Sequence, residues 1–157
     1  MKIIDSIHKD AISSSLEAGD KIGVLEELVK PMADISGSDW KELARDLLAR
    51  ESLGSTGIGG GIGIPHCKRK DIDSMILGLG ISKQGIDFDS IDSRPVHIFF
   101  VLITPEDGAG LHLKLLSRIS RLLKDHFFKE RLLAAKDRHE IYSIIQKEEE
   151  NLWGGDD

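Results

Sequence analysis

The segment VHIFFVLIT, at residues 96–104, is apolar at almost every position. A strand with one solvent-facing side alternates apolar and polar residues, whereas a strand covered on both faces reads as a nearly continuous apolar run. A second run of this kind spans residues 75–81. The two runs predict central strands of a sheet that is covered by helices on both faces, which is an α/β architecture.

Helical periodicity flanks these strands. From Lys21, apolar residues recur at spacings of three and four, and Pro31 predicts that this helix ends or kinks at Lys30. Ser38 is predicted to cap a second helix, and a third is expected from Leu111 onward. We also expect a short strand over residues 12–16, a strand or turn over residues 85–95, and one or two helices over residues 128–146.

Length and charge limit the class of protein. The chain has 157 residues, 40% of them hydrophobic and 31% charged, which suits one soluble globular unit. We expect a single compact domain over residues 1–150 and a flexible acidic tail over residues 151–157. The formal net charge of −6 argues against general nucleic-acid binding, because that function needs a basic surface.

Cysteine use and hydropathy indicate the compartment. The single cysteine, Cys67, excludes an internal disulfide and favours a reducing environment. The first residues lack the apolar core of a signal peptide, and no apolar stretch approaches the length of a membrane span. We therefore expect a cytoplasmic protein without membrane insertion.

Residues 54–66, GSTGIGGGIGIPH, are dense in glycine. Glycine loses much backbone entropy on folding, so such a segment predicts positive φ angles or close backbone approach. A dinucleotide fingerprint fails here, because its last glycine position falls on Ile62 or Ile64. A phosphate-binding P-loop fails as well, because no Gly-Lys-Ser/Thr sequence follows.

The passage ends in His66. Pro65 fixes its own φ and biases Ile64 toward extended geometry, so His66 is expected to leave a short strand in a defined direction. A neutral imidazole is a competent nucleophile near pH 7, because its ordinary pKa is about 6.5. From these residues alone, an ordinary surface or core histidine remains the alternative.

The motif TGIGGGIGIPH, at residues 56–66, resembles the phosphorylation site of the phosphotransferase system enzyme IIA family of the fructose, mannitol and nitrogen-regulatory type (type 2). LLARE at residues 47–51, IDFDSID at 86–92 and LITPEDGAGLHLKLLSRISRLLKD at 102–125 match in the same order, so the resemblance covers roughly residues 12–146. It implies a mixed central sheet flanked by helices in a single domain, and the activity of a protein-histidine phosphocarrier, which is a phosphotransferase. The IDFDSID segment and the lack of fused domains resemble the nitrogen-regulatory branch most.

The resemblance also implies roles for Arg50 and His112. Arg50 falls near the end of the second helix, where a guanidinium can bind phosphate oxygens; a cation that complements the helix dipole is the alternative. His112 falls in the first turn of the third helix, on its inward face, where the helix terminus disfavours an imidazolium. Its alternative is a core histidine with a satisfied hydrogen bond.

The other candidate site residues have less support from the sequence. Cys67 stands where the family commonly has a small residue, and its thiol is expected to make the site sensitive to oxidation, although no activating partner can be assigned to it. His97 is interpreted as structural, and no motif surrounds the remaining histidines, which are His8, His126 and His139.

The resemblance therefore implies phosphoryl transfer from HPr, or an HPr-like carrier, to Nε2 of His66, with Arg50 and His112 stabilising the transferred group. No metal or organic cofactor is expected for this chemistry. The group then passes to an enzyme IIB domain in sugar transport, or the phosphorylated state controls regulatory target proteins. The sequence leaves these two outcomes open, together with the sugar, the downstream partner and the oligomeric state. A domain of the same fold that binds a ligand without being phosphorylated is the third hypothesis.

Overall fold

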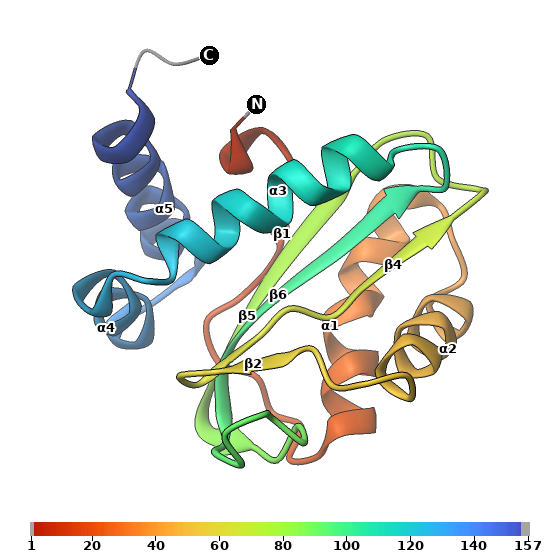
Figure 1. Cartoon of the computed structure of the whole chain (residues 1–157), viewed down its shortest axis with the longest axis horizontal. Helices are drawn as coiled ribbons and strands as arrows, with labels where there is room; N and C mark the ends of the chain where they lie inside the picture. Colours follow the sequence, from red (N-terminus) through yellow and green to blue (C-terminus); the bar gives the residue numbers. More distant parts are fainter. Residues whose placement is uncertain (1, 155–157) are drawn as a thin grey trace.

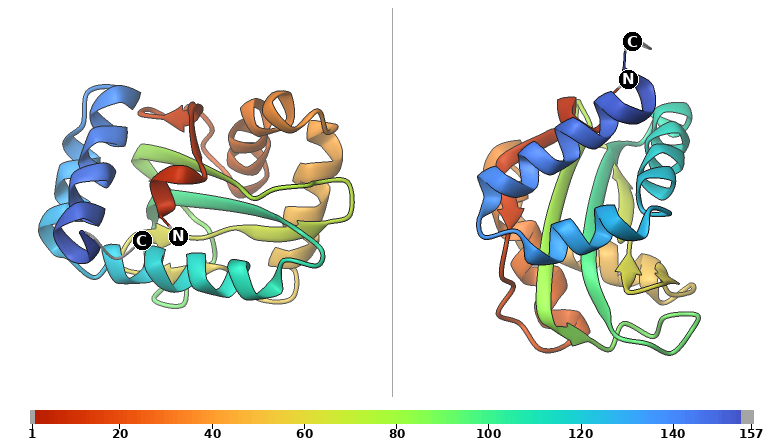
Figure 2. Two further views of the ribbon diagram at one scale, coloured as in Figure 1. Left: turned by 90° about the horizontal axis from the view of Figure 1, so that it is seen from above. Right: turned by 90° about the vertical axis from the view of Figure 1, so that its left-hand side faces the viewer.

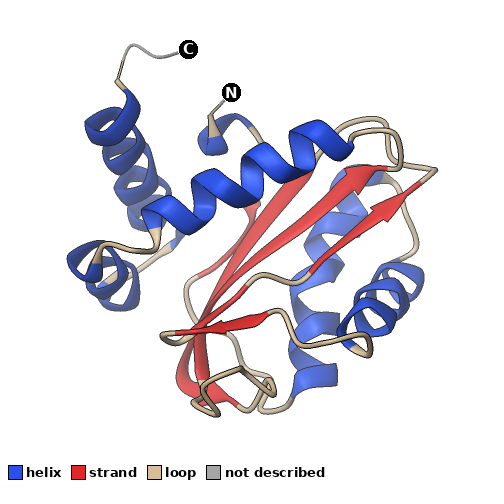
Figure 3. Cartoon of the chain, in the orientation of Figure 1, coloured by secondary structure: helices blue, strands red, loops and turns tan. Residues whose placement is uncertain are grey.

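The computed structural model describes residues 2–154 of the chain. Within them a mixed six-stranded sheet has the order β1-β5-β6-β3-β2, with β4 also paired to β6. Figures 1 and 3 show the sheet at the centre and the helices around it. The strands are β1 (Ile7–Ser13), β2 (Gly57–Gly59), β3 (Ile62–Gly63), β4 (His66–Arg69), β5 (Ile76–Ile86) and β6 (Val96–Pro105). The helices are the 3-10 turn η1 (Ile3–Asp5), α1 (Lys21–Ser36), α2 (Trp40–Glu51), α3 (Ala109–Leu122), α4 (His126–Ala134) and α5 (Arg138–Trp153).

The sheet separates two apolar layers. Ile98 and Leu102 of β6 belong to the layer packed under α3, α4 and α5, whereas Phe99 and Ile103 belong to the layer against α1 and α2. The view from above in Figure 2 shows α3 along one side of the sheet and α1 along the other. Both faces of β6 are therefore buried, which explains the uninterrupted apolar run. The predicted α/β architecture is confirmed, and the two predicted central strands are β5 and β6, paired antiparallel.

Pro65 divides what would otherwise be one strand. β3 and β4 both pair in parallel with β6, one after the other along its length. Proline has no N–H to contribute to a sheet, but its carbonyl accepts the Leu102 N–H at 3.0 Å and keeps the chain beside β6. His66 is consequently the first residue of β4; the sequence predicts only that it leaves a short strand, which is β3.

The glycines of the passage serve both expected purposes. Gly59, Gly60 and Gly61 have φ angles of 94°, 66° and 81° in the turn between β2 and β3, a region that favours glycine. Gly57 instead permits close approach, because a Cβ there would overlap Ser90 Oγ and lie 3.0 Å from Ser90 Cα.

Two predicted boundaries in the first half of the chain are wrong. β1 begins at Ile7 and ends at Ser13, earlier than the strand predicted over residues 12–16. α1 does not end at Lys30 but continues through Pro31 to Ser36, and Gly37 terminates it with a φ of 74°. Burial of Met32 and Ala33 beyond the proline supports that continuation against the loss of one helical N–H.

The cap of α2 also differs from the prediction. Asp39, rather than Ser38, caps this helix, and its carboxylate accepts the Lys41 N–H at 2.9 Å. The backbone N–H of Ser38 instead bonds to the Ala33 carbonyl at the end of α1, at 3.2 Å. α3 begins at Ala109, and the remainder of the chain forms two helices, α4 and α5, within the predicted range of one or two.

The helix α5 extends past the predicted domain boundary at residue 150. Leu152 and Trp153 pack against the core, and the Arg118 guanidinium lies 4.0 Å from the centroid of the Trp153 ring. Glu149 is buried, with its carboxylate accepting the N–H of Ile3 at 2.7 Å. The tail predicted for residues 151–157 thus begins too early, and residues 155–157 lie outside the described part of the chain. None of the helices within residues 2–154 is long and apolar enough to cross a membrane.

Candidate functional site

His66 is half-buried at the start of β4. Its Nδ1 lies 2.7 Å from the carbonyl oxygen of Ile64. A carbonyl only accepts hydrogen bonds, so Nδ1 carries the proton and the lone pair of Nε2 is available. Burial lowers the pKa of His66 below its ordinary value; the Ile64 hydrogen bond opposes this shift, and the positive charge of Arg50 adds to it. The ring is therefore neutral and nucleophilic near pH 7.

His112 lies beside His66. It is 5% exposed in the first turn of α3, and its ring centroid is 5.1 Å from that of His66, with the two planes at 65°. Burial lowers the pKa of His112 to about 4, and the charges of His66 and Lys68 act in the same direction. The predicted inward position is confirmed, and this imidazole is neutral at physiological pH.

Thr104 completes the surroundings of His112. Its Oγ1 lies 2.9 Å from Nδ1 of His112, and the residue is fully buried on β6. When this hydroxyl donates to Nδ1, the proton of the neutral ring resides on Nε2, which can then donate to an oxygen near His66. Thr104 was not predicted as a site residue, because a threonine that ends an apolar run gives no sign of its partner on α3.

Arg50 reaches the site from the other helical layer. It lies in the last turn of α2, and its Nη1 donates to the Gly54 carbonyl at 2.9 Å, in the loop that leads into β2. Its positive charge contributes to the lowered pKa of His66, so the guanidinium acts on the imidazole electrostatically. One N–H of five makes the bond to Gly54, and a planar guanidinium can offer others to an anion.

Lys68 is a second cation at the site, and it was not predicted from the sequence either. Alternate residues of a strand share one face, so Lys68 lies on the same side of β4 as His66. It is exposed and pairs in register with Thr104, the partner of His112. Its charge contributes to the lowered pKa of both histidines. Two histidines and two cations therefore converge where β4, α3 and the end of α2 meet, an arrangement suited to an anionic group on His66.

Known proteins resemble this chain in sequence and in fold. The family model described as "Phosphoenolpyruvate-dependent sugar phosphotransferase system, EIIA 2" matches residues 5–148. The chain belongs to this family of phosphoryl carriers. The predicted family is thus confirmed.

Two relatives illustrate the range of this EIIA family. A nitrogen regulatory protein of Bradyrhizobium diazoefficiens is 36% identical over 145 residues, which are 92% of this chain and 95% of the relative. The fructose-specific EIIABC component of Bacillus subtilis is also 36% identical, over 149 residues that are 94% of this chain but 23% of that protein. One relative named for regulation and one named for sugar transport thus have the same sequence identity to this EIIA chain.

Solved structures agree on the EIIA fold. Nitrogen regulatory protein IIA-Ntr from Neisseria meningitidis superposes with a TM-score of 0.86 at 28% identity, covering 91% of this chain and 98% of that one. The mannitol IIA protein of Escherichia coli gives a TM-score of 0.74 at 18% identity, covering 88% and 97%, and supports the fold alone.

Cys67 faces the opposite layer of this EIIA domain. Its side chain packs against the apolar cluster between the sheet and the helices α1 and α2. Burial raises the pKa of the thiol to about 12, and the nearby Asp46 carboxylate acts in the same direction. Because the thiolate is the form that reacts with oxidants, this environment argues against the expected sensitivity to oxidation.

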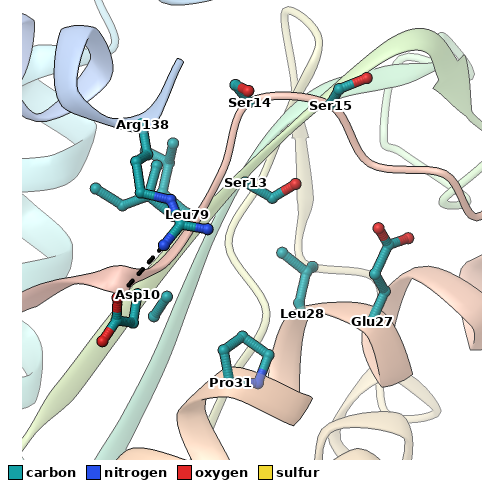
Figure 4. A pocket seen from close by; sticks show the side chains of 11 residues that line it. Asp10, Ser13, Ser14, Ser15, Glu27, Leu28, Pro31, Leu79 and Arg138 are labelled. Carbon is teal, nitrogen blue, oxygen red and sulfur yellow. Dashed lines mark hydrogen bonds and ion pairs between the residues drawn. The ribbon is translucent and has the colours of Figure 1, made fainter.

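His97 and a hollow between β1 and α1 lie apart from this site. The Nδ1 of His97 bonds to the Ser82 carbonyl at 2.8 Å, which supports the predicted structural role. A pocket of about 370 Å³ lies between β1, α1 and the start of α5 (Figure 4). On its wall, Nη1 of Arg138 donates to Oδ1 of Asp10 at 3.3 Å. Its lining residues are distinct from those around His66. Within residues 2–154, no three His, Cys, Asp or Glu side chains are grouped as a metal site requires.

Proposed function

We propose that this chain is a phosphocarrier in which Nε2 of His66 accepts a phosphoryl group from the phosphohistidine of HPr or an HPr-like carrier. The observation that carries the proposal is the 2.7 Å contact between Nδ1 of His66 and the Ile64 carbonyl. It leaves Nε2 as the nucleophilic atom, and membership of the EIIA family supplies the chemical class.

The transfer exchanges one N–P bond for another. The lone pair of Nε2 attacks phosphorus, the N–P bond to the donor imidazole breaks, and its electron pair returns to the donor nitrogen. Attachment of phosphorus gives the His66 ring a positive charge while Nδ1 keeps its proton. The hydrogen bond from Nδ1 to the Ile64 carbonyl is then charge-assisted and becomes stronger.

The neighbouring groups stabilise the transferred oxygens. A loose phosphoryl transition state spreads negative charge over three equatorial oxygens, so catalysis depends on donors placed around them. Arg50 supplies guanidinium N–H groups, His112 supplies Nε2–H, and Lys68 supplies a further positive charge at the exposed side of the strand. A neutral His112 suits this role, because it donates a hydrogen bond without adding charge before the phosphoryl group arrives.

Two fates of the phosphoryl group follow from the relatives. The first is transfer to an enzyme IIB domain in sugar uptake; the mannitol IIA protein of Escherichia coli, at 17% identity, is described in complex with a phosphorylated enzyme IIB. The second is regulation, in which the phosphorylation state of His66 controls the binding of target proteins, and the similarity to nitrogen regulatory proteins supports it. We place either activity in the cytoplasm, where phosphoenolpyruvate is formed.

Intact-mass spectrometry tests the carrier chemistry. The chain is incubated with phosphoenolpyruvate, enzyme I and HPr, and in parallel with the carriers of the nitrogen branch. We expect the added mass of one acid-labile phosphoryl group on the wild type and none on His66→Ala. Modification of His66→Ala to the same extent, or no modification of the wild type with either set of carriers, would overturn the proposal.

Sugar uptake then separates the two fates. In cells that lack the chain, loss of uptake of a phosphotransferase sugar, restored by the wild type and not by His66→Ala, supports transport. Unchanged uptake of every such sugar, together with a partner that binds only one phosphorylation state, supports regulation.

A further inference from the structure

Glu51, the residue that follows Arg50, is a buried carboxylate. The residue is 5% exposed and its side chain 1%. A buried charge is costly unless hydrogen bonds and a counter-charge compensate it. The carboxylate accepts the Thr56 N–H at 3.0 Å and also the Thr56 hydroxyl, and the Lys21 ammonium lies 3.3 Å away. Its partners therefore come from α1 and from the loop before β2, rather than from its own helix.

Thr56 continues the chain of hydrogen bonds toward the site. Its carbonyl accepts the N–H of Ile64 at 3.0 Å, and the Ile64 carbonyl accepts Nδ1–H of His66 at 2.7 Å. Thr56 and Ile64 are 5% and 4% exposed, so these bonds are shielded from water. These bonds belong to successive peptide groups, so Thr56 and Ile64 are linked through their fixed backbones. Loss of one member leaves a buried polar group without its partner and displaces the next.

We infer that Glu51 is a positioning residue for phosphoryl transfer: by holding both donors of Thr56 it fixes the backbone of Thr56 and of Ile64, and the Ile64 carbonyl sets the orientation and tautomer of His66. The inference rests on the proposed function, because it concerns the atom that the His66 ring presents to the donor. Glu51 itself does not touch the reacting atoms.

Lys21 lies at the end of this series of contacts that is farthest from His66. It is the first residue of α1; its ammonium also lies 3.4 Å from Asp89 and 4.6 Å from the centroid of the Phe88 ring. Its side chain is 19% exposed, so water can reach the ammonium while Glu51 stays buried. Lys21 thereby balances the charge of the carboxylate and ties α1 to the loop that precedes the phosphorylation motif.

Glu51 also acts on His66 electrostatically. Its negative charge opposes the effect of burial on the His66 pKa, whereas Arg50 and Lys68 act with burial. His112, the other titratable group against the ring, is neutral near pH 7 and adds no charge there. Removal of the Glu51 charge is therefore expected to lower the pKa of His66 further, beside its effect on geometry.

The test compares Glu51→Gln with Glu27→Gln. Glu27 is a matched control, because its carboxylate also accepts backbone N–H groups, those of Glu17 and Ala18. It takes no part in the hydrogen bonds that lead to His66. Imidazole nitrogen NMR of the unphosphorylated protein reports which nitrogen of His66 is protonated. We expect a single Nδ1–H form in the wild type and in Glu27→Gln, and a mixture of the two tautomers in Glu51→Gln.

Transfer kinetics provide the second measurement. We expect Glu51→Gln to lower kcat for phosphoryl transfer from HPr by about tenfold, with KM for HPr unchanged, because the nucleophile is misplaced while the docking surface is kept. Glu27→Gln should transfer at the wild-type rate. Equal His66 tautomers and equal kcat in the two variants would overturn the inference.

Thr56 variants keep the test valid if Glu51→Gln does not fold. Thr56→Val removes the hydroxyl at nearly constant volume and should reproduce the tautomer mixture and the slower transfer. Thr56→Ser keeps the hydroxyl and should show the single Nδ1–H tautomer and the transfer rate of the wild type. A Thr56→Val protein with wild-type tautomer and kcat would contradict the inference. The tautomer measurement needs no phosphoryl donor. Failure of the wild type to accept phosphate would therefore reject the proposed function, while the effect of Glu51 on the His66 tautomer could still be measured.

Discussion

The ring of His112 meets that of His66 at 65°, with 5.1 Å between centroids, while its Nδ1 is bonded to the Thr104 hydroxyl. Two neutral imidazoles in contact divide the chemistry between them. In the proposed function, His66 offers a lone pair at Nε2, and His112 offers a proton at its own Nε2. Burial lowers the pKa of both rings, so both stay neutral near pH 7 and the lone pair of His66 is not lost to a proton.

Loss of the His112 donor should slow phosphorylation. We expect His112→Ala to reduce the initial rate of transfer from HPr on the order of 100-fold, the usual cost of one transition-state donor. Thr104→Val, which removes only the hydroxyl that directs the proton to Nε2, should have a smaller effect in the same direction. Rapid-quench measurement of phosphoprotein formation gives both rates; a wild-type rate for His112→Ala would exclude its proposed role.

Phosphoryl transfer should depend on Arg50 and not on Arg45, an arginine of the same helix. Arg50→Ala removes a guanidinium that acts on His66, and we expect transfer to slow on the order of 100-fold. Arg50→Lys should restore only part of the rate, because an ammonium lacks the planar fork. The matched control is Arg45→Ala on the same helix, since Arg45 is 71% exposed by its side chain and pairs only loosely with Glu42, at 3.9 Å. Equal rates in Arg45→Ala and Arg50→Ala would remove Arg50 from the site.

Stability should fall as the medium becomes mildly acidic. The pKa of His112 is about 4 in the folded state against an ordinary value of 6.5, so the unfolded chain binds the proton more readily. The contribution is fully present above pH 6.5 and is lost as the pH falls toward 4, at a total cost of about 3 kcal/mol. The lowered pKa of His66 acts in the same sense.

Urea unfolding between pH 7 and pH 4 measures this dependence. His112→Gln should flatten the slope, because the amide does not titrate. Hydrogen bonds lower the pKa of Asp71 and of Asp92, so the stability that these carboxylates contribute begins to be lost only below about pH 5. The slope between about pH 7 and pH 5 is therefore the part to compare. An unchanged slope in His112→Gln would mean that another group causes the loss of stability.

The sequence predicts the centre of this fold better than its edges. β5 and β6 are buried on both faces, so their apolar runs identify them without further information. The position of β1 is harder to predict, because it is an edge strand with polar residues at its start and a register shift between Ile7 and Ile12, which removes regular alternation. The end of α1 is also predicted wrongly. Local propensity predicts a break at Pro31, but the burial of apolar residues on both sides of the proline maintains the helix.

Within the site, the sequence indicates the residues that belong to motifs and not those defined by register. His66 follows from the glycines and Pro65, and Arg50 and His112 from their matched segments. Thr104 and Lys68 become partners only because β4 and β6 pair in parallel, with these two residues opposite each other. Glu51 is adjacent to Arg50, but its link to His66 runs through two backbone groups that no pattern of side chains reveals.

Two glycine substitutions separate the roles of glycine in this chain. A methyl group on Gly57 would overlap Ser90 Oγ and lie 3.0 Å from Ser90 Cα, and Ser90 is 7% exposed and has little room to move. We expect Gly57→Ala to destabilise the protein by about 1–3 kcal/mol through overpacking. A methyl group on Gly110 would meet no atom within 4 Å beyond its own turn of α3, and Gly110 has no positive φ, so Gly110→Ala should stabilise by about 1 kcal/mol.

Urea unfolding of both variants measures the difference. Because Gly57 directly follows Thr56, displacement of its backbone should also disturb the hydrogen bonds that lead to His66. Gly57→Ala is therefore expected to lose the single Nδ1–H tautomer of His66, whereas Gly110→Ala should keep it. A Gly57→Ala protein of wild-type stability and tautomer would mean that the segment of residues 87–95 moves away at no cost, and that contact with Ser90 does not hold β2 in place.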